Sequence, residues 1–401
     1  MAEIRSPRAG ESAGIARVES LAFNTEVPEA EVGLLGKMCA YEGDEVVATA
    51  TVIDFDQWFG GSAMPCAGVA SVAVLPEHRG RGVAGSLMRA LLARERARGR
   101  LLSALYPANS GLYRSLGYEY CGLRPRLWAP LADLPPKPAG VEWPREMTPS
   151  DLPAVVACHA EWAAGHNGPL RPADPARWAQ HVLAHRGEGV HQRTVVVPGE
   201  RGVEGYASYF TTEAQGFGDY TLQCKHLVAL TPAALGSLLA YFGRFTTAAR
   251  QLSWFGPPSG GPAAFAMSTN GMSLGADLRR WMGRMLDVPG ALAQRGYPRP
   301  PDGRPTELVL EVADPVFPEN AGPWHVTVAE GRAQVVPAAQ QPAGPGTGEP
   351  ALPVGLLSAA FSGMATVQDL VALGALAPSG GLADALSRVF SGPLPWMPDF
   401  F

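Results

Sequence analysis

The chain has 401 residues, which predicts two or three domains at roughly 150 residues each. Hydrophobic residues make up 46% of it and charged residues 17%, a balance that supplies buried cores and excludes a largely disordered chain. Lys and Arg number 32 against 37 Asp and Glu, a net charge of −5, so there is no positive excess for non-specific binding of nucleic acid.

The cysteines and the apolar runs bear on where the protein works. The five cysteines (Cys39, Cys66, Cys121, Cys158 and Cys224) lie far apart, without CxxC or metal-ligand spacing. We therefore expect no disulfide framework and no bound metal. Residues 1–14 lack the apolar core of a signal peptide, and no apolar run reaches the roughly 18 residues of a membrane span. A cytoplasmic protein without a membrane span is expected.

The first segment is predicted to be an α/β domain that ends near the proline-rich stretch 129–144. Residues 45–55 and 66–76 are rich in β-branched side chains and predict strands. Apolar residues recur at helical spacing over 83–98, and 101–108 predicts a further strand. A short helix over 110–119 follows, with Ser110 placed to cap it and Gly117 to end it.

Two further segments follow. Residues 226–245 repeat an apolar strand and helix without a basic, glycine-rich link, which indicates a second copy of the first fold that has lost its phosphate loop. After the Pro/Gly-rich stretch 287–305, alternating apolar residues predict strands around 308–312 and 324–328. A loop over 337–350, helices over 365–377 and 382–390, and an aromatic tail complete the chain. The expected domains are 1–135, 136–290 and 291–401.

The motif that indicates chemistry lies in residues 71–92, where a predicted strand runs through Arg79, Gly80, Arg81 and Gly82 into a helix. Glycines let successive backbone N–H groups converge, and a helix N-terminus adds unpaired donors and partial positive charge. The loop can therefore cradle a pyrophosphate. It is neither a Walker loop nor a G-x-G-x-x-G motif. The alternative is an ordinary strand-to-helix turn with surface arginines.

The pattern Arg79-x-x-Gly82-x-Ala84 resembles the signature of the GNAT acyltransferases, whose loop holds the pyrophosphate of coenzyme A. The resemblance implies acetyl-CoA as co-substrate. It also implies that Tyr113, in the pattern Tyr113-x-x-x-Gly117-Tyr118, is the acid that protonates the departing thiolate, with Tyr118 and Tyr120 as competing candidates. The backbone N–H of Val74 is the candidate for steadying the oxyanion. The implied cofactor-binding residues are Val72, Ala73, Val74, Arg79, Gly80, Arg81, Gly82, Val83, Ala84, Gly85, Ala108 and Asn109.

Over nearly its full length, the chain resembles the enhanced-intracellular-survival (Eis) acetyltransferases. The likeness lies in residues 72–82, 111–118, 168–178 and 280–297 and in the terminal Phe401. It implies an α/β (α+β) architecture of tandem GNAT folds, one active and one degenerate, followed by a sterol-carrier-protein-like domain, and assembly as a hexamer. It also implies that the carboxylate of Phe401 enters the active site as the base that takes the proton of the amine.

One position departs from the Eis pattern. Members of that family carry an acidic residue just before the terminal Phe, where this chain has Phe400, with Asp399 one step earlier. The exchange removes one anionic contact for a polycationic substrate. Glu26, Asp54, Asp56 and Asp399 are candidates to supply acidity instead.

The leading hypothesis is therefore acetyl-CoA-dependent N-acetylation of a small-molecule amine. Aminoglycosides, acetylated at one or several positions, are the first substrate class and lysine side chains of peptides the second. A lipid or sterol carrier with a vestigial first domain, and an acyl-CoA-sensing scaffold whose oligomer is the function, are alternatives from other classes.

Overall fold

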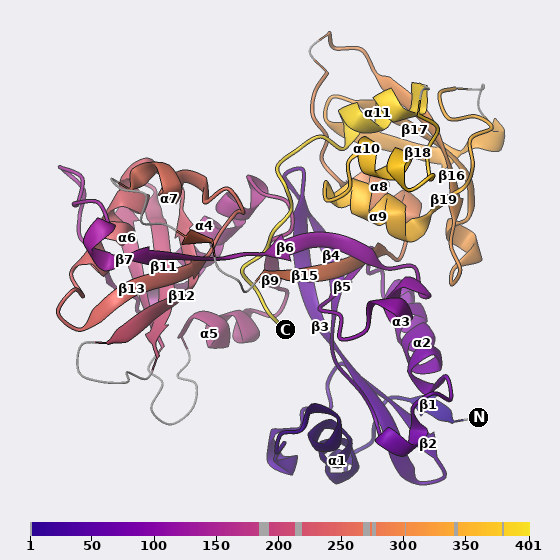
Figure 1. Ribbon diagram of the computed structural model, residues 1–401, viewed down its shortest axis with the longest axis horizontal. Helices are drawn as coiled ribbons and strands as arrows, with labels where there is room; N and C mark the ends of the chain where they lie inside the picture. The colour runs from indigo at the N-terminus through magenta and orange to yellow at the C-terminus, as the bar shows by residue number, and fades with distance from the viewer. Residues whose placement is uncertain are drawn as a thin grey trace.

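The computed structural model of the chain describes residues 2–183, 192–212, 219–267, 273–274, 278–300, 302–340, 344–378 and 381–401. Within these ranges the strands form three sheets, of eight, seven and four strands. Each sheet organises one body of the molecule, and the C-terminus lies between the first two bodies (Figure 1). None of the described helices is both long and apolar enough to cross a membrane.

The first sheet has the order β1-β2-β3-β4-β5-β15-β6, with the short β9 also paired to β3. The strands predicted over 45–55 and 66–76 and the helix predicted over 83–98 are confirmed, the helix because Leu87, Leu91 and Leu92 turn one buried face to the sheet. Its elements from the first segment are β1 (Glu3–Arg5), α1 (Ser12–Phe23), β2 (Lys37–Glu42), β3 (Glu45–Phe59), β4 (Ser62–Val74), α2 (Val83–Ala97), β5 (Leu102–Leu105), α3 (Ser110–Arg114) and β6 (Glu119–Arg124).

The second sheet has the order β14-β7-β13-β12-β11-β10-β8. In it the succession β12–α6–β13–α7 repeats the succession β4–α2–β5–α3 of the first sheet, and both strand pairs are parallel. The expected second copy of the fold is therefore confirmed. The elements of this part are β7 (Arg126–Pro130), β8 (Arg145–Glu146), α4 (Leu152–Ala164), β9 (Leu170–Pro172), α5 (Pro175–Leu183), β10 (Arg193–Gly199), β11 (Gly202–Thr211), β12 (Tyr220–Ala229), α6 (Pro232–Gly243), β13 (Ala249–Phe255), α7 (Gly261–Ala266) and β14 (Ser273–Leu274).

The two large sheets exchange strands. β7 follows β6 directly in the chain but pairs with β13 in the second sheet. In return, β15 (Arg279–Met285) leaves the second segment and lies antiparallel between β5 and β6 of the first sheet. Gly122 on β6 faces the ring of the buried Trp281 on β15, where a Cβ would come 2.4 Å from the indole. Strands of the first sheet therefore lie on both sides of the boundary expected near residue 135, whereas all strands of the third sheet follow the boundary expected near residue 290.

The third body is a four-stranded sheet of order β18-β17-β16-β19, covered by helices. The predicted alternation is confirmed, since Leu308, Leu310 and Val312 are buried on one strand and Val326 and Val328 on the next. The expected loop over 337–350 includes residues 341–343, which lie outside the described ranges. The elements are α8 (Val288–Gln294), β16 (Thr306–Ala313), β17 (Gly322–Ala329), β18 (Arg332–Pro337), β19 (Leu352–Pro353), α9 (Val354–Ser362), α10 (Val367–Ala372) and α11 (Gly381–Val389).

The strand exchange can be tested at Gly122. Replacing Gly122 by Ala forces a methyl group into the Trp281 ring. We expect the free energy of unfolding to fall by about 1–3 kcal/mol because an overpacked core has to shift. Gly33→Ala is the matched control, because its Cβ would meet no heavy atom of the described residues within 4 Å. Denaturant unfolding of both variants is the measurement, and equal stability of the two would contradict the pairing of β15 with β6.

Candidate active site

The site begins where β4 and β5 part. The two strands pair in parallel from Cys66↔Leu102 to Val69↔Leu105, where β5 ends, while β4 continues to Val74. At Ser71 the backbone adopts φ +50°, and the register of β4 against β3 shifts beside it. This bulge bends the end of β4 away from β5. A wedge opens between the strands, and no strand of the described residues pairs with residues 72–74 on the side away from β3.

The N–H of Val74 points into this wedge. The neighbouring residue Leu75 donates its backbone N–H to Val47 O on β3 at 3.0 Å. Backbone groups of an antiparallel pair alternate between facing the partner strand and facing away, so the N–H of Val74 is directed away from β3. An extended ligand that contains amide groups, or an oxyanion, can bind to this edge.

The loop between β4 and α2 has the geometry of an anion cradle. Gly80 and Gly82 have φ of 76° and 77°, a region that favours glycine, and no heavy atom of the described residues lies within 4 Å of where their Cβ atoms would stand. α2 begins at the next residue, Val83, without an acidic residue in its first turn. Its first N–H groups have no intrahelical acceptor. Arg79 and Arg81 are exposed beside them, and Arg79 Nε donates to Val74 O at 3.2 Å.

Tyr113 lies on α3, directly after β5. The helix is capped by Asn109, whose Oδ1 accepts from Gly111 N at 3.0 Å and Leu112 N at 3.3 Å. The expectation that Ser110 caps this helix is therefore wrong, because Ser110 is already the first helical residue. The ring of Tyr113 is buried against Tyr118, and burial raises the pKa of Tyr113 to about 12. At neutral pH the phenol consequently keeps its proton.

The two competing tyrosines are engaged elsewhere. The Tyr118 hydroxyl lies 2.7 Å from Ser103 Oγ in the core, and burial raises the pKa of Tyr118 as well. The Tyr120 ring is half-buried beneath the guanidinium groups of Arg114 and Arg280, each 5.4 Å from its centroid. The Tyr118 hydroxyl would have to leave Ser103 to act as an acid, whereas no hydrogen bond from another described residue holds the hydroxyl of Tyr113 or Tyr120.

The C-terminal tail crosses from the third body to the first sheet (Figure 1). Trp396 forms a parallel bridge with Leu123 at the end of β6. Further along, Arg124 Nε donates to Pro398 O at 2.8 Å and the Tyr106 hydroxyl donates to Asp399 O at 2.6 Å. The apolar tail is thus docked on the first sheet. Most of these bonds go to main-chain atoms of the tail.

Phe401 ends on the face of the first sheet. Its ring centroid lies 5.0 Å from that of Phe55 and 5.7 Å from that of Tyr106. Gly68 on β4 leaves room for it, because a Cβ there would come 3.0 Å from the Phe401 ring. Phe401 and Ser71 both line a cavity of about 830 Å³ that extends past residues 31–37 to residues 174–177 of the second segment. All three bodies therefore contribute to the surroundings of the β4 bulge.

Phe400 lies among cations. The exposed ring packs against Tyr106 in a tilted arrangement, with 4.8 Å between the ring centroids, and Arg279 lies over it at 4.9 Å and Arg124 at 5.5 Å. The candidate acids offer little free negative charge nearby. Asp54 is paired with Arg98 and Arg100, and Asp56 with Arg171. Asp399 is buried, with one carboxylate oxygen 3.4 Å from Leu170 N, and Glu26 is exposed.

The cysteines near the site are not activated. Cys66 and Cys121 are free and fully buried, and burial raises the pKa of the Cys121 thiol to about 12. A buried, protonated thiol is a poor nucleophile. Trp58 and Phe59 are also buried in the core.

The structure also adds residues that sequence reasoning missed, among them Ser71, Tyr106 and Arg124. Tyr106 and Arg124 act through contacts with a tail some 270 or more residues away, for which the sequence holds no local signal. The bulge at Ser71 shows only as a serine within an apolar strand.

Comparison with known proteins agrees with this geometry. Residues 3–121 and residues 172–284 each match an acetyltransferase (GNAT) domain family, and residues 288–398 match the sterol carrier protein domain family. An uncharacterized N-acetyltransferase of Streptomyces coelicolor is 29% identical over 390 residues, covering 90% of this chain and 87% of that protein. A GCN5-related N-acetyltransferase from Kribbella flavida is 28% identical, with a TM-score of 0.85 over 100% of this chain and 98% of the other. Eis1 from Mycobacterium abscessus is 22% identical, with a TM-score of 0.78 over 100% of both chains.

The fold and the matches define the class: the chain is a GNAT acetyltransferase with tandem GNAT domains and a C-terminal sterol carrier domain. The whole chain also has the fold of Eis1 from Mycobacterium abscessus. The expected fold class is thereby confirmed.

The cap of α3 provides a test of how Tyr113 is held. We expect Asn109→Ala to lower the free energy of unfolding by about 1 kcal/mol, because two helix N–H groups lose their acceptor. Ser110→Ala should leave stability nearly unchanged. Thermal unfolding of the two variants distinguishes them, and a larger loss in Ser110→Ala would show that the cap is misassigned.

Proposed function

We propose that the protein transfers the acetyl group of acetyl-CoA directly to the nitrogen of an amine. The observation that carries this proposal is the wedge between β4 and β5, with an uncapped helix N-terminus after β4 and the helix that holds Tyr113 after β5. An aminoglycoside is the first acceptor to test and the lysine side chain of a peptide the second.

Coenzyme A would bind in this wedge with each of its parts matched to a local feature. The pyrophosphate would accept hydrogen bonds from the backbone amides of residues 80–85, with Arg79 and Arg81 supplying positive charge. The pantetheine arm contains amides and would extend along Val72, Ala73 and Val74. Ala108 and Asn109, which follow β5, would close the other side.

The transfer then needs the amine, a donor for the oxyanion, an acid for the thiolate and a base for the proton of the amine. The lone pair of the uncharged amine attacks the thioester carbon, and the N–C bond forms. The N–H of Val74 stabilises the oxyanion of the tetrahedral intermediate. When the intermediate collapses, the C–S bond breaks and the Tyr113 hydroxyl protonates the leaving thiolate.

The proton lost by the amine would go to the carboxylate of Phe401, directly or through water. A terminal carboxyl has an ordinary pKa of about 3.3–3.7, so it is ionised at neutral pH and is a weak base unless its surroundings raise that value. Its position supports the role, because the Phe401 ring packs on Phe55 of the sheet and lines the same cavity as Ser71.

The charges around Phe400 favour the second acceptor class. Phe400 stands at the position where members of the Eis family carry an acid. The guanidinium groups of Arg279 and Arg124 lie over its ring. A polycation would be repelled there, whereas a lysine whose peptide carries a nearby carboxylate would be attracted. We retain peptide lysines as a second candidate on this observation.

Location and assembly are part of the same proposal. Five free, buried cysteines fit the reducing cytoplasm. The likeness to Eis proteins suggests a homo-oligomer, a hexamer in that family. Light scattering after size exclusion gives the mass of the assembly.

Activity is tested by thiol release from acetyl-CoA with a panel of aminoglycosides and lysine peptides. We expect turnover with at least one amine, and a loss of about 100-fold or more in kcat for Tyr113→Phe, because only the donated proton is removed. The affinity for acetyl-CoA, measured by calorimetry, should be unchanged. Tyr120→Phe is the matched control. Tight binding without turnover for every amine would instead support a sensing scaffold, and no coenzyme A binding would support a carrier.

The role of the tail is tested by extending it. Adding two glycines after Phe401 moves the carboxylate while keeping every side chain of the tail. We expect kcat to fall at least tenfold with little change in melting temperature, since the carboxylate acts as the base. A fully active extended protein would exclude the terminal carboxylate as that base.

A further inference from the structure

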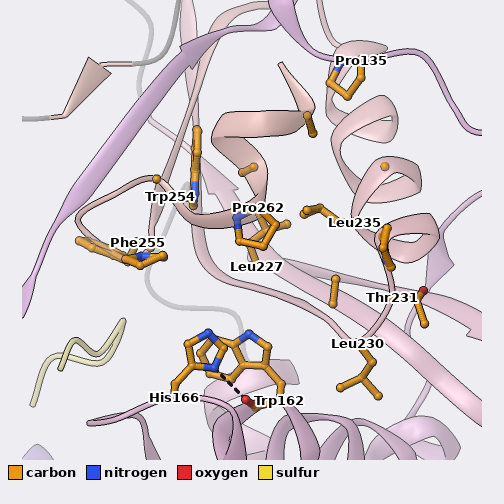
Figure 2. A pocket seen from close by; sticks show the side chains of 18 of the residues that line it. Pro135, Trp162, His166, Leu227, Leu230, Thr231, Leu235, Trp254, Phe255 and Pro262 are labelled. Atoms are coloured by element: carbon orange, nitrogen blue, oxygen red, sulfur yellow. Dashed lines mark hydrogen bonds between the residues drawn. The ribbon is translucent and has the colours of Figure 1, made fainter. Parts of the chain in front are cut away.

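The second sheet has a cavity of its own in the position of the acetyl-CoA wedge of the first (Figure 2). β12 and β13 pair in parallel as far as Cys224↔Trp254, after which β12 continues to Ala229. The same separation follows Val69↔Leu105 in the first sheet. The cavity beside the separated strands has a volume of about 480 Å³, within the range of small-molecule sites.

This cavity cannot take a pyrophosphate as the first wedge would. α6 begins with Pro232, which has no N–H, and the Thr231 hydroxyl caps the helix by accepting from Ala234 N at 3.1 Å. The carboxylate of Glu204 lies 3.5 Å from the same hydroxyl. The helix N-terminus is thus already capped and has a negative charge beside it, so an anionic ligand is disfavoured.

The walls are aromatic and rigid. Figure 2 shows Trp254 and Phe255 on one side of the cavity, Leu235 and Thr231 opposite, and Trp162 with His166 across one end. Trp396 of the tail and several prolines complete the lining, and none of the described lining residues is Asp, Glu, Lys or Arg. Flat, stiff walls of this kind suit a ring system by offset and edge-to-face stacking.

His166 supplies the lining of the cavity with a hydrogen-bond acceptor for a ligand. His166 Nδ1 lies 2.8 Å from Trp162 O, and since a carbonyl only accepts, Nδ1 carries the hydrogen. Burial lowers the pKa of His166, which keeps the ring neutral. Its other nitrogen, Nε2, is then a hydrogen-bond acceptor.

We propose that this cavity of the second GNAT domain is a separate ligand site, which binds an uncharged aromatic molecule with a hydrogen-bond donor. The ring system would pack between the half-buried Trp162 and Leu235, with Trp254 and Trp396 buried behind the lining, and its O–H or N–H would donate to His166 Nε2. A fatty acid fits less well because its carboxylate would find no cation among the described lining residues. The inference does not depend on the transfer reaction of the first domain.

The probe for the experiment is N-phenyl-1-naphthylamine, a neutral aromatic fluorophore with one N–H. Titrated into the full chain, it should gain fluorescence with a dissociation constant in the micromolar range. Leu235→Trp fills the cavity from α6 and should weaken binding at least tenfold. Phe265→Trp adds the same indole on α7, where Phe265 is 90% exposed, and should leave binding unchanged. If Leu235→Trp loses its melting transition, Ala266→Phe fills the cavity from α7 instead.

The hydrogen bond is tested with a matched ligand. N-methylation of the probe removes its donor and should weaken binding to the parent chain roughly two- to tenfold. His166→Phe should weaken binding of the N–H probe to the same level and abolish the difference between the two probes. Absence of binding to the parent chain, or undiminished binding to both cavity-filling variants, overturns the proposal. The second result would place the probe elsewhere, for example in the sterol carrier domain.

Discussion

The separation of two parallel strands after a few paired residues is the constraint on which this molecule depends. Parallel strands in a continuous sheet satisfy each other's backbone groups, and there is then no room for a ligand between them. Here the bulge at Ser71 turns the end of β4 away from β5. Backbone donors are exposed at the point where an uncapped helix begins, so the fold itself supplies an edge for amides and an end for phosphates.

The second sheet shows how the same geometry is changed by a few side chains. β12 and β13 separate as β4 and β5 do, yet Thr231 and Pro232 stand where the first domain has its glycine-rich loop. A side-chain hydroxyl and a proline remove the donors that a pyrophosphate would need. The fold is retained while the chemistry that it offers is lost, which illustrates that function lies in the site and not in the fold.

Much of the site was accessible from the sequence, because its key features are local. The basic glycine-rich loop and the helix after it occupy one stretch of chain, which predicts a cradle for a pyrophosphate. The resemblance to the GNAT acyltransferases adds the tyrosine on the next helix as the candidate acid. Other elements were not predicted from the sequence, mainly because their partners lie far away in the chain. α9 is buried on nearly all sides and shows no polar face to mark it as a surface helix. β15 carries three arginines and two methionines that do not alternate clearly, and its place between β5 and β6 is fixed by strands about 160–180 residues earlier. Asn109 and Ser110 are both good caps, so sequence preference could not decide between them.

The exchange of β7 and β15 between the sheets has a consequence for biogenesis. A nascent chain that has emerged only as far as β7 holds β5 and β6 without the strand that joins them, and each presents unsatisfied edges. The first lobe cannot close until residue 285 has left the ribosome, although N-terminal domains ordinarily fold first during synthesis. The first sheet is therefore completed only after the second segment of the chain has been synthesised, which makes that segment a structural part of the first domain.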